Sequence, residues 1–106
     1  MTDTVDTAFP VSSAEHVLCL IPTDGGHLLV TEDRIAMSHG ERVVVDLPIV
    51  EIRRIQLDIE RRRPATFVIV PDSPRTEPQV VPIPVAHYDA VCAASAHIGR
   101  VLDSLD

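Results

Sequence analysis

Residues 85 to 105 read VAHYDAVCAASAHIGRVLDSL, and the spacing of side chains in this stretch decides the fold. The spacings of three and four predict one amphipathic α-helix over residues 85–105, with Cys92 on its apolar face. The residues expected on that face are Tyr88, Val91, Ser95, Ile98, Leu102 and Leu105. Gly99 costs about 1 kcal/mol relative to alanine inside a helix, which indicates close backbone packing at Gly99 or slight fraying of the helix beyond it.

The residues before this helix alternate between short apolar runs and turn formers. Ile55, Leu57 and Ile59 alternate with polar neighbours, which is the period of a strand with one face in the core and one in water. Pro82 and Pro84 confine the last run to a sheet edge, because proline cannot donate to a strand ladder. The predicted strands cover residues 16–21, 27–31, 35–39, 42–47, 54–60, 65–70 and 79–84.

Seven antiparallel strands followed by a single helix make the expected fold mainly β, in the α+β class. Short connections favour a meander, and a meander of this size curls into a barrel or two orthogonal sheets with the helix across an open end. The chain has 106 residues. We expect one domain over residues 15–106, preceded by a flexible N-terminal tail over residues 1–14.

Composition narrows the classes of function. Nine arginines and no lysine face sixteen carboxylates, and the formal charge is -7. This balance argues against nucleic-acid binding, which requires a basic face that neutralises many phosphates. The N-terminus lacks signal-peptide features and no apolar run reaches the roughly 20 residues of a membrane span, so we expect a cytoplasmic protein. Cys19 and Cys92 lie among apolar neighbours, and we expect both to be small buried side chains.

The stretch from Gly25 to Leu57 resembles the front half of a bacterial pleckstrin-homology-like (PH-like) or GRAM-like domain. The residues that carry the resemblance are Gly26, Leu28, Val30, Thr31, Arg34, Ile35, Leu47, Pro48, Ile49 and Ile52. The resemblance implies a seven-stranded antiparallel PH-like barrel or orthogonal sandwich capped by one C-terminal helix. It also implies a binding or scaffolding module. The lipid site of many PH domains does not carry over, because the first hairpin loop, PTDGGH, contains no basic residue.

Three consecutive arginines, Arg61, Arg62 and Arg63, are the candidate anion-binding residues. Arginine suits phosphate and carboxylate groups because its planar fork donates two parallel hydrogen bonds. The alternative is a solvated hairpin tip whose charges pair with Asp58, Glu60 or a neighbouring loop, and such surface pairs contribute only about 0 to 1 kcal/mol. The sequence favours the solvated tip.

Other candidate sites are weaker. Pro82 and Pro84 mark an edge that protects against aggregation or shapes a partner-binding groove beside the helix. His27 is expected to face Ser38 across a hairpin while His39 points to the other side of the sheet, so we expect no metal site.

The pattern contains no P-loop, dinucleotide fingerprint, HExxH or CxxC motif. The acidic run before Arg34 is that of an ordinary turn. We therefore expect no enzyme and no cofactor. The leading hypothesis is a non-catalytic module that binds a protein partner or itself. Weak, salt-sensitive binding of anionic lipid or phosphate through the arginine-rich loop is the alternative, and a small-molecule carrier using the barrel interior is a third possibility.

Overall fold

The computed structural model describes residues 14–23 and 25–105. The tail expected over residues 1–14 therefore lies outside the described residues, apart from Ala14. The strands are β1 (Val17–Thr23), β2 (Gly26–Thr31), β3 (Arg34–His39), β4 (Arg42–Pro48), β5 (Ile52–Asp58), β6 (Ala65–Pro71) and β7 (Gln79–Ile83). The helices are two single 3-10 turns, η1 (Ile49–Glu51) and η2 (Val85–His87), and the α-helix α1 (Tyr88–Asp103). The prediction of a mainly β chain with one C-terminal helix is confirmed.

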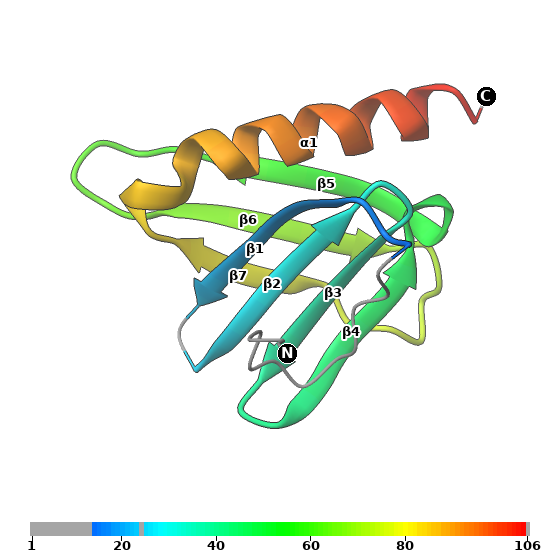
Figure 1. The fold of residues 1–106 in the computed structure, drawn as a ribbon, viewed down its shortest axis with the longest axis horizontal. Coiled ribbons are helices and arrows are strands. Elements are labelled where there is room, and N and C mark those ends of the chain that lie inside the picture. Colours follow the sequence, from blue (N-terminus) through cyan, green and yellow to red (C-terminus); the bar gives the residue numbers. More distant parts are fainter. Residues whose placement is uncertain (1–13, 24, 106) are drawn as a thin grey trace.

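The seven strands form two antiparallel sheets (Figure 1). One has four strands in the order β1-β2-β3-β4, and the other has three in the order β5-β6-β7. No ladder joins β4 to β5, because Pro48 ends one strand and the 3-10 turn η1 redirects the chain before the next begins. The sequence predicted either a barrel or two orthogonal sheets. The described strands form two sheets and no closed barrel.

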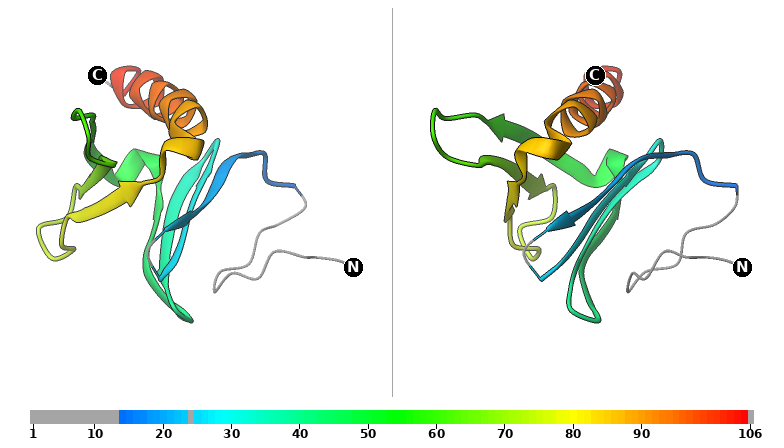
Figure 2. Two further views of the ribbon diagram at one scale, coloured as in Figure 1. Left: turned by 90° about the vertical axis from the view of Figure 1, so that its left-hand side faces the viewer. Right: turned by 60° about the vertical axis from the view of Figure 1, so that its left-hand side comes forward.

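One apolar core lies between the two sheets and the helix. Phe67 on β6 is its largest fully buried side chain. Figure 2 shows α1 lying across the open side where the sheets diverge. The helix contributes Val91, Ala94 and Ile98, each with at most 1% of its surface exposed. The helix expected from the spacing of apolar residues is therefore present, and it packs as predicted against the sheets.

The buried face of the helix is narrower than predicted. Cys92 is exposed, so the expectation that it is a small buried side chain is wrong, whereas Cys19 is buried as expected. Leu105 lies beyond the last helical residue and is 53% exposed. The helix packs on the sheets through Val91, Ala94 and Ile98. Cys92 is the next residue after Val91 and lies about 100° further around the helix, so its side chain points towards solvent.

Two hydrogen bonds fix the helix on the sheets. Near its start, the Tyr88 hydroxyl accepts a hydrogen bond from the backbone N–H of Ala65 at 2.8 Å. Further along, His97 Nε2 lies 2.9 Å from the carbonyl oxygen of Glu32, in the turn between β2 and β3. The helix is thereby tied to both sheets.

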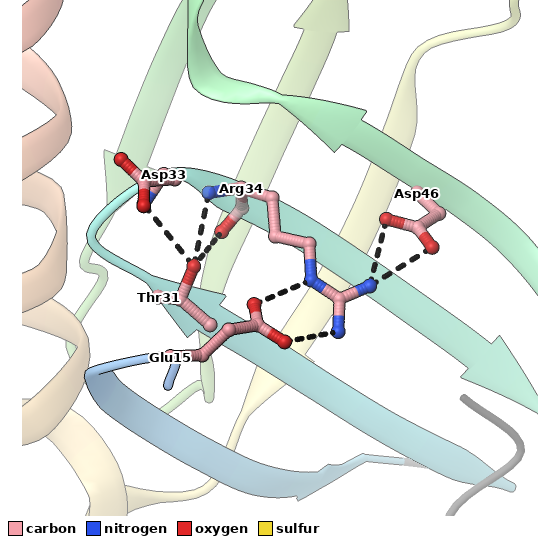
Figure 3. A network of polar contacts seen from close by, with 5 residues as sticks. All are labelled: Glu15, Thr31, Asp33, Arg34 and Asp46. Atoms are coloured by element: carbon pink, nitrogen blue, oxygen red, sulfur yellow. Dashed lines mark hydrogen bonds and ion pairs between the residues drawn. The ribbon is translucent and has the colours of Figure 1, made fainter. Parts of the chain in front are cut away.

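That turn is organised by one buried hydroxyl (Figure 3). Thr31 is 1% exposed, and its Oγ1 accepts hydrogen bonds from the backbone N–H groups of Asp33 at 3.1 Å and Arg34 at 3.0 Å. The carbonyl of Asp33 accepts a further bond from Ile49 at 2.8 Å. Thr31 therefore holds the turn that meets both α1 and η1.

We predict that Thr31→Val lowers the free energy of unfolding by about 1 to 3 kcal/mol, because two backbone donors lose their acceptor. Thr31→Ser keeps the acceptor oxygen and should recover most of the loss. Denaturant unfolding of the two variants checks this. A stable Thr31→Val protein together with a destabilised Thr31→Ser protein would show that the methyl group, and not the oxygen, holds the turn.

Two glycines have opposite surroundings. A Cβ at Gly26 would lie 1.8 Å from the carbonyl oxygen of Ser38, so β2 and β3 approach too closely there for any side chain. A Cβ at Gly99 would meet nothing within 4 Å. Of the two alternatives at Gly99, close backbone packing is therefore wrong.

The same substitution should have opposite effects at these two positions. Gly26→Ala should destabilise the protein by several kcal/mol or prevent folding, because backbone must move apart. Gly99→Ala should stabilise it by about 0.5 to 1 kcal/mol, because alanine is the better helix former. Thermal unfolding of both variants against the parent tests the pair. A destabilised Gly99→Ala protein would contradict this view of the helix.

Candidate functional site

A hollow on the described surface lies where the β5–β6 connection meets the start of the C-terminal helix. It is open and has a volume of about 470 Å³. We call it the hairpin groove. Its lining consists of Ile59, Glu60, Arg62, Arg63, Pro64, Pro84, Val85 and Tyr88. The size is within the range of small ligand sites, roughly 300 to 1,000 Å³.

The apolar walls of the groove come from both sides. Ile59 follows β5 and is 59% exposed, and Val85 begins η2 and is 73% exposed. Tyr88 also lines the groove, and its hydroxyl already accepts a hydrogen bond from Ala65. Exposed aliphatic side chains around one hollow are hydrated unfavourably. Their burial against an apolar group of a partner would therefore be favourable.

The cationic rim comes from the turn between β5 and β6. Arg61, Arg62 and Arg63 are all exposed, and Arg62 has a backbone φ of 65°. That left-handed conformation is strained for a residue with a Cβ and is normally taken by glycine. An arginine at this position therefore carries a conformational cost that a glycine would not.

The predicted ion pairs at this tip are not found among the described residues. Asp58 instead accepts a hydrogen bond from Gln56 at 2.7 Å. The described ion pairs involve Arg34 and His16, and none involves the three arginines. Arg61 to Arg63 are exposed, as predicted for a solvated tip, and their expected pairing with Asp58, Glu60 or a neighbouring loop is not found among the described residues. Three guanidinium groups are thus left to face solvent or a partner.

The structure separates the two prolines that the sequence grouped as one partner-binding edge. Pro84 lines the hairpin groove together with Arg62 and Arg63. Pro82 lies within β7 opposite Thr66 and is not part of that lining. The arginine-rich loop and Pro84, which are more than twenty residues apart, therefore form one site that the sequence had treated as two.

A second hollow lies at the other end of β5. It has a volume of about 350 Å³ and is lined by Arg53, Arg54 and Val70. These arginines were expected at the far end of the strand from Arg61 to Arg63, and that placement is confirmed.

The polar network around Arg34 is a structural one (Figure 3). Its Nε and Nη2 donate to the carboxylate of Glu15 at 2.8 and 3.0 Å, and Nη1 donates to both oxygens of Asp46. The hydrogen bond to Glu15 is the main reason that the pKa of Arg34 lies above its usual value. Thr31 and Arg34, both part of the PH-like pattern, therefore act in the turn and in ion pairs within the fold.

The other titratable residues of the described part of the chain form no metal cluster. His27 faces Ser38 across β2 and β3, as predicted. No group of three or more His, Cys, Asp or Glu side chains suited to a metal occurs within residues 14–23 and 25–105. Burial raises the pKa of the Cys19 thiol to about 11, although a hydrogen bond with the backbone of Val30 opposes this. Cys19 is therefore protonated at neutral pH and poorly nucleophilic.

Comparison with known proteins adds no family. Neither a protein-family model nor a curated protein matches the chain. In the described part of the chain, no helix has the length and apolar character needed to cross a membrane.

Sequence reasoning missed Ile59 and Val85 as parts of the site. Ile59 was placed on the core face of its strand, but β5 ends at Asp58. Val85 was placed in the helix, but it precedes α1. An aliphatic residue at the end of an apolar period, beside a proline or a charged turn, is the available signal for such exposure.

The backbone strain at Arg62 can be tested by its effect on the stability of the fold. We predict that Arg62→Gly raises the free energy of unfolding by about 0.5 to 1 kcal/mol, because glycine accepts positive φ without a Cβ clash. Denaturant unfolding measures the change, with Arg61→Gly as the control that should not gain stability. Equal effects of the two glycines would exclude strain at residue 62.

Proposed function

We propose that this chain is a non-catalytic PH-like binding module and that its hairpin groove holds an apolar side chain of a protein partner. The observation that carries the proposal is the coincidence of exposed Ile59 and Val85 with arginines that have no carboxylate partner among the described residues. Arginine and tyrosine are enriched among the residues that dominate protein interfaces, and both residue types line this groove.

The PH-like part of this proposal rests on sequence resemblance and on topology. Seven antiparallel strands followed by one helix are what the resemblance implies, and two facing sheets are compatible with an orthogonal sandwich. The glycine and threonine of the resembling stretch have packing roles, at Gly26 and Thr31. This supports a shared scaffold and leaves the ligand to be argued from the groove.

The proposal of a non-catalytic role rests on the chemistry of the groove lining. Its polar groups are one carboxylate, two guanidinium groups and a tyrosine hydroxyl that already accepts a hydrogen bond. A nucleophile held by a base, the usual requirement for covalent catalysis, is not among the described lining residues. These groups suit recognition by charge and by apolar contact.

Binding of anionic lipid or free phosphate is the second candidate, and the unpaired Arg61, Arg62 and Arg63 favour it. Basic residues at a membrane surface contribute about 1 kcal/mol each, so three give weak and salt-sensitive attachment. The net charge of -7 opposes approach to an anionic membrane. Apolar groove walls with a cationic rim suit a protein segment that carries both an apolar and an acidic side chain better than a phosphate alone.

We predict that Val85→Asp removes binding of the native partner, because a carboxylate enters the apolar wall. Loss of a central apolar contact should weaken binding at least about tenfold. Cross-linking and pull-down from the native lysate, with the parent protein and the variant compared, identify partners that depend on the groove. Val50→Asp is the matched control, since Val50 is 56% exposed on η1 and lies outside the groove.

A protein retained by the parent and by Val50→Asp, but lost with Val85→Asp, supports the proposal. Identical captures by all three proteins contradict it. Sedimentation with phosphatidylserine vesicles tests the second candidate. There, Arg61→Glu, Arg62→Glu and Arg63→Glu together are compared with the same change at Arg42, Arg75 and Arg100, which are also exposed. Loss of vesicle binding in the first triple alone would favour lipid over protein.

A further inference from the structure

The outer face of the three-stranded sheet is an exposed surface that the hairpin groove does not use. Phe67 and Ile69 on β6 are buried in the core, so the alternating residues Thr66, Val68 and Val70 point to the opposite side. Figure 2 shows the helix and the four-stranded sheet together on the core side of β5, β6 and β7. We call the opposite side the outer face.

The centre of the outer face is apolar. The register places Gln56, Val68 and Val80 side by side across the three strands. Val80 is 62% exposed although it lies within a strand. Pro82 lies one row further along β7, opposite Thr66. A sheet face that presents aliphatic side chains to water favours burial against another surface.

The two ends of the outer face carry opposite charges. Along β5, Arg54 lies opposite Val70, and Asp58 lies opposite Thr66. Gln56 lies midway between them. The two charged residues are four positions apart, or about 13 Å. Arg54, with Arg53, lines the hollow beside Val70 and has no ion-pair partner among the described residues.

This arrangement is self-complementary under a two-fold rotation. An axis that runs across the strands, along the row of Gln56, Val68 and Val80, places each strand over its own copy and reverses its direction. Arg54 of one copy then lies opposite Asp58 of the other, and the reverse pair forms by symmetry. Symmetric dimers require such a surface, in which one patch is complementary to itself.

We propose that two copies of this chain pair through the outer faces of their three-stranded sheets, with the central valines in contact and Arg54 opposite Asp58 at both ends. Sheets packed face to face cross at about 30°, so the ends of two facing strands are displaced sideways from each other. That displacement is within the reach of an arginine side chain. The proposal concerns a surface other than the hairpin groove and does not depend on the proposed function.

The β7 edge of this sheet is poorly suited to pairing with another strand. No described strand pairs with that edge, and Pro82 has no N–H to donate there.

The size of the outer face sets the expected affinity. Three short strands offer less than the roughly 800 Å² per partner of a standard interface. The dimer should therefore be in equilibrium with the monomer, with a Kd in the micromolar range or weaker, around 10 to 500 μM.

Sedimentation equilibrium with complementary charge variants tests this dimer. Arg54→Glu places two acidic residues opposite each other, and Asp58→Arg places two arginines opposite each other. Each variant alone should dimerise at least about tenfold more weakly than the parent. An equimolar mixture restores both attractive pairs, and its heterodimer should recover the parent Kd to within about threefold.

Two controls separate this result from general effects. Arg42→Glu makes the same charge change on β4 and should leave the dimer unchanged. Val85→Asp alters the hairpin groove and should also leave it unchanged, so failure of either proposal is distinguishable from failure of the other. Circular dichroism establishes that each variant is folded. A parent that stays monomeric up to about 1 mM, single variants that dimerise like the parent, or a mixture that stays monomeric would overturn the proposal.

Discussion

Burial of one narrow face of the C-terminal helix is the constraint on which the rest of the structure depends. The two sheets diverge, and their inner faces would meet water along the open side if α1 did not cover them. Val91, Ala94 and Ile98 make that cover, and a fully buried valine or isoleucine contributes about 1.5 to 3 kcal/mol. The hydrogen bond that Tyr88 accepts from Ala65 and the contact of His97 with the Glu32 carbonyl then set where the helix lies along each sheet.

The same constraint produces the candidate site. Tyr88 is the first residue of α1, and its hydroxyl meets β6 at Ala65, directly after the arginine-rich turn. The start of the helix and the turn are thereby brought together, with Ile59 and Val85 exposed between them. The position of this groove is therefore a consequence of how the helix is anchored. Most of its lining residues lie in the connections that precede β6 and α1.

Charge is unevenly distributed along the chain, and this shapes both proposed surfaces. Five of the nine arginines lie between residues 53 and 63, with only two of the sixteen carboxylates. The hairpin of β5 and β6 is thus a basic element in an acidic protein. At its tip the arginines flank an apolar groove, and on its outer face Arg54 and Asp58 stand at opposite ends of an apolar row. Local charge of this kind directs specificity and orientation more than it adds affinity.

The sequence by itself determined the order of strands and helix, and the pairing of His27 with Ser38 across a hairpin, because these follow from local periods of two and 3.6 residues and from nearby turns. It did not determine that the strands divide into two sheets, that Cys92 faces water, or that Arg62 and Pro84 line one groove while Pro82 lies elsewhere. Only the tertiary structure decided these, because they depend on how segments far apart in the chain pack together, and no local period records that packing.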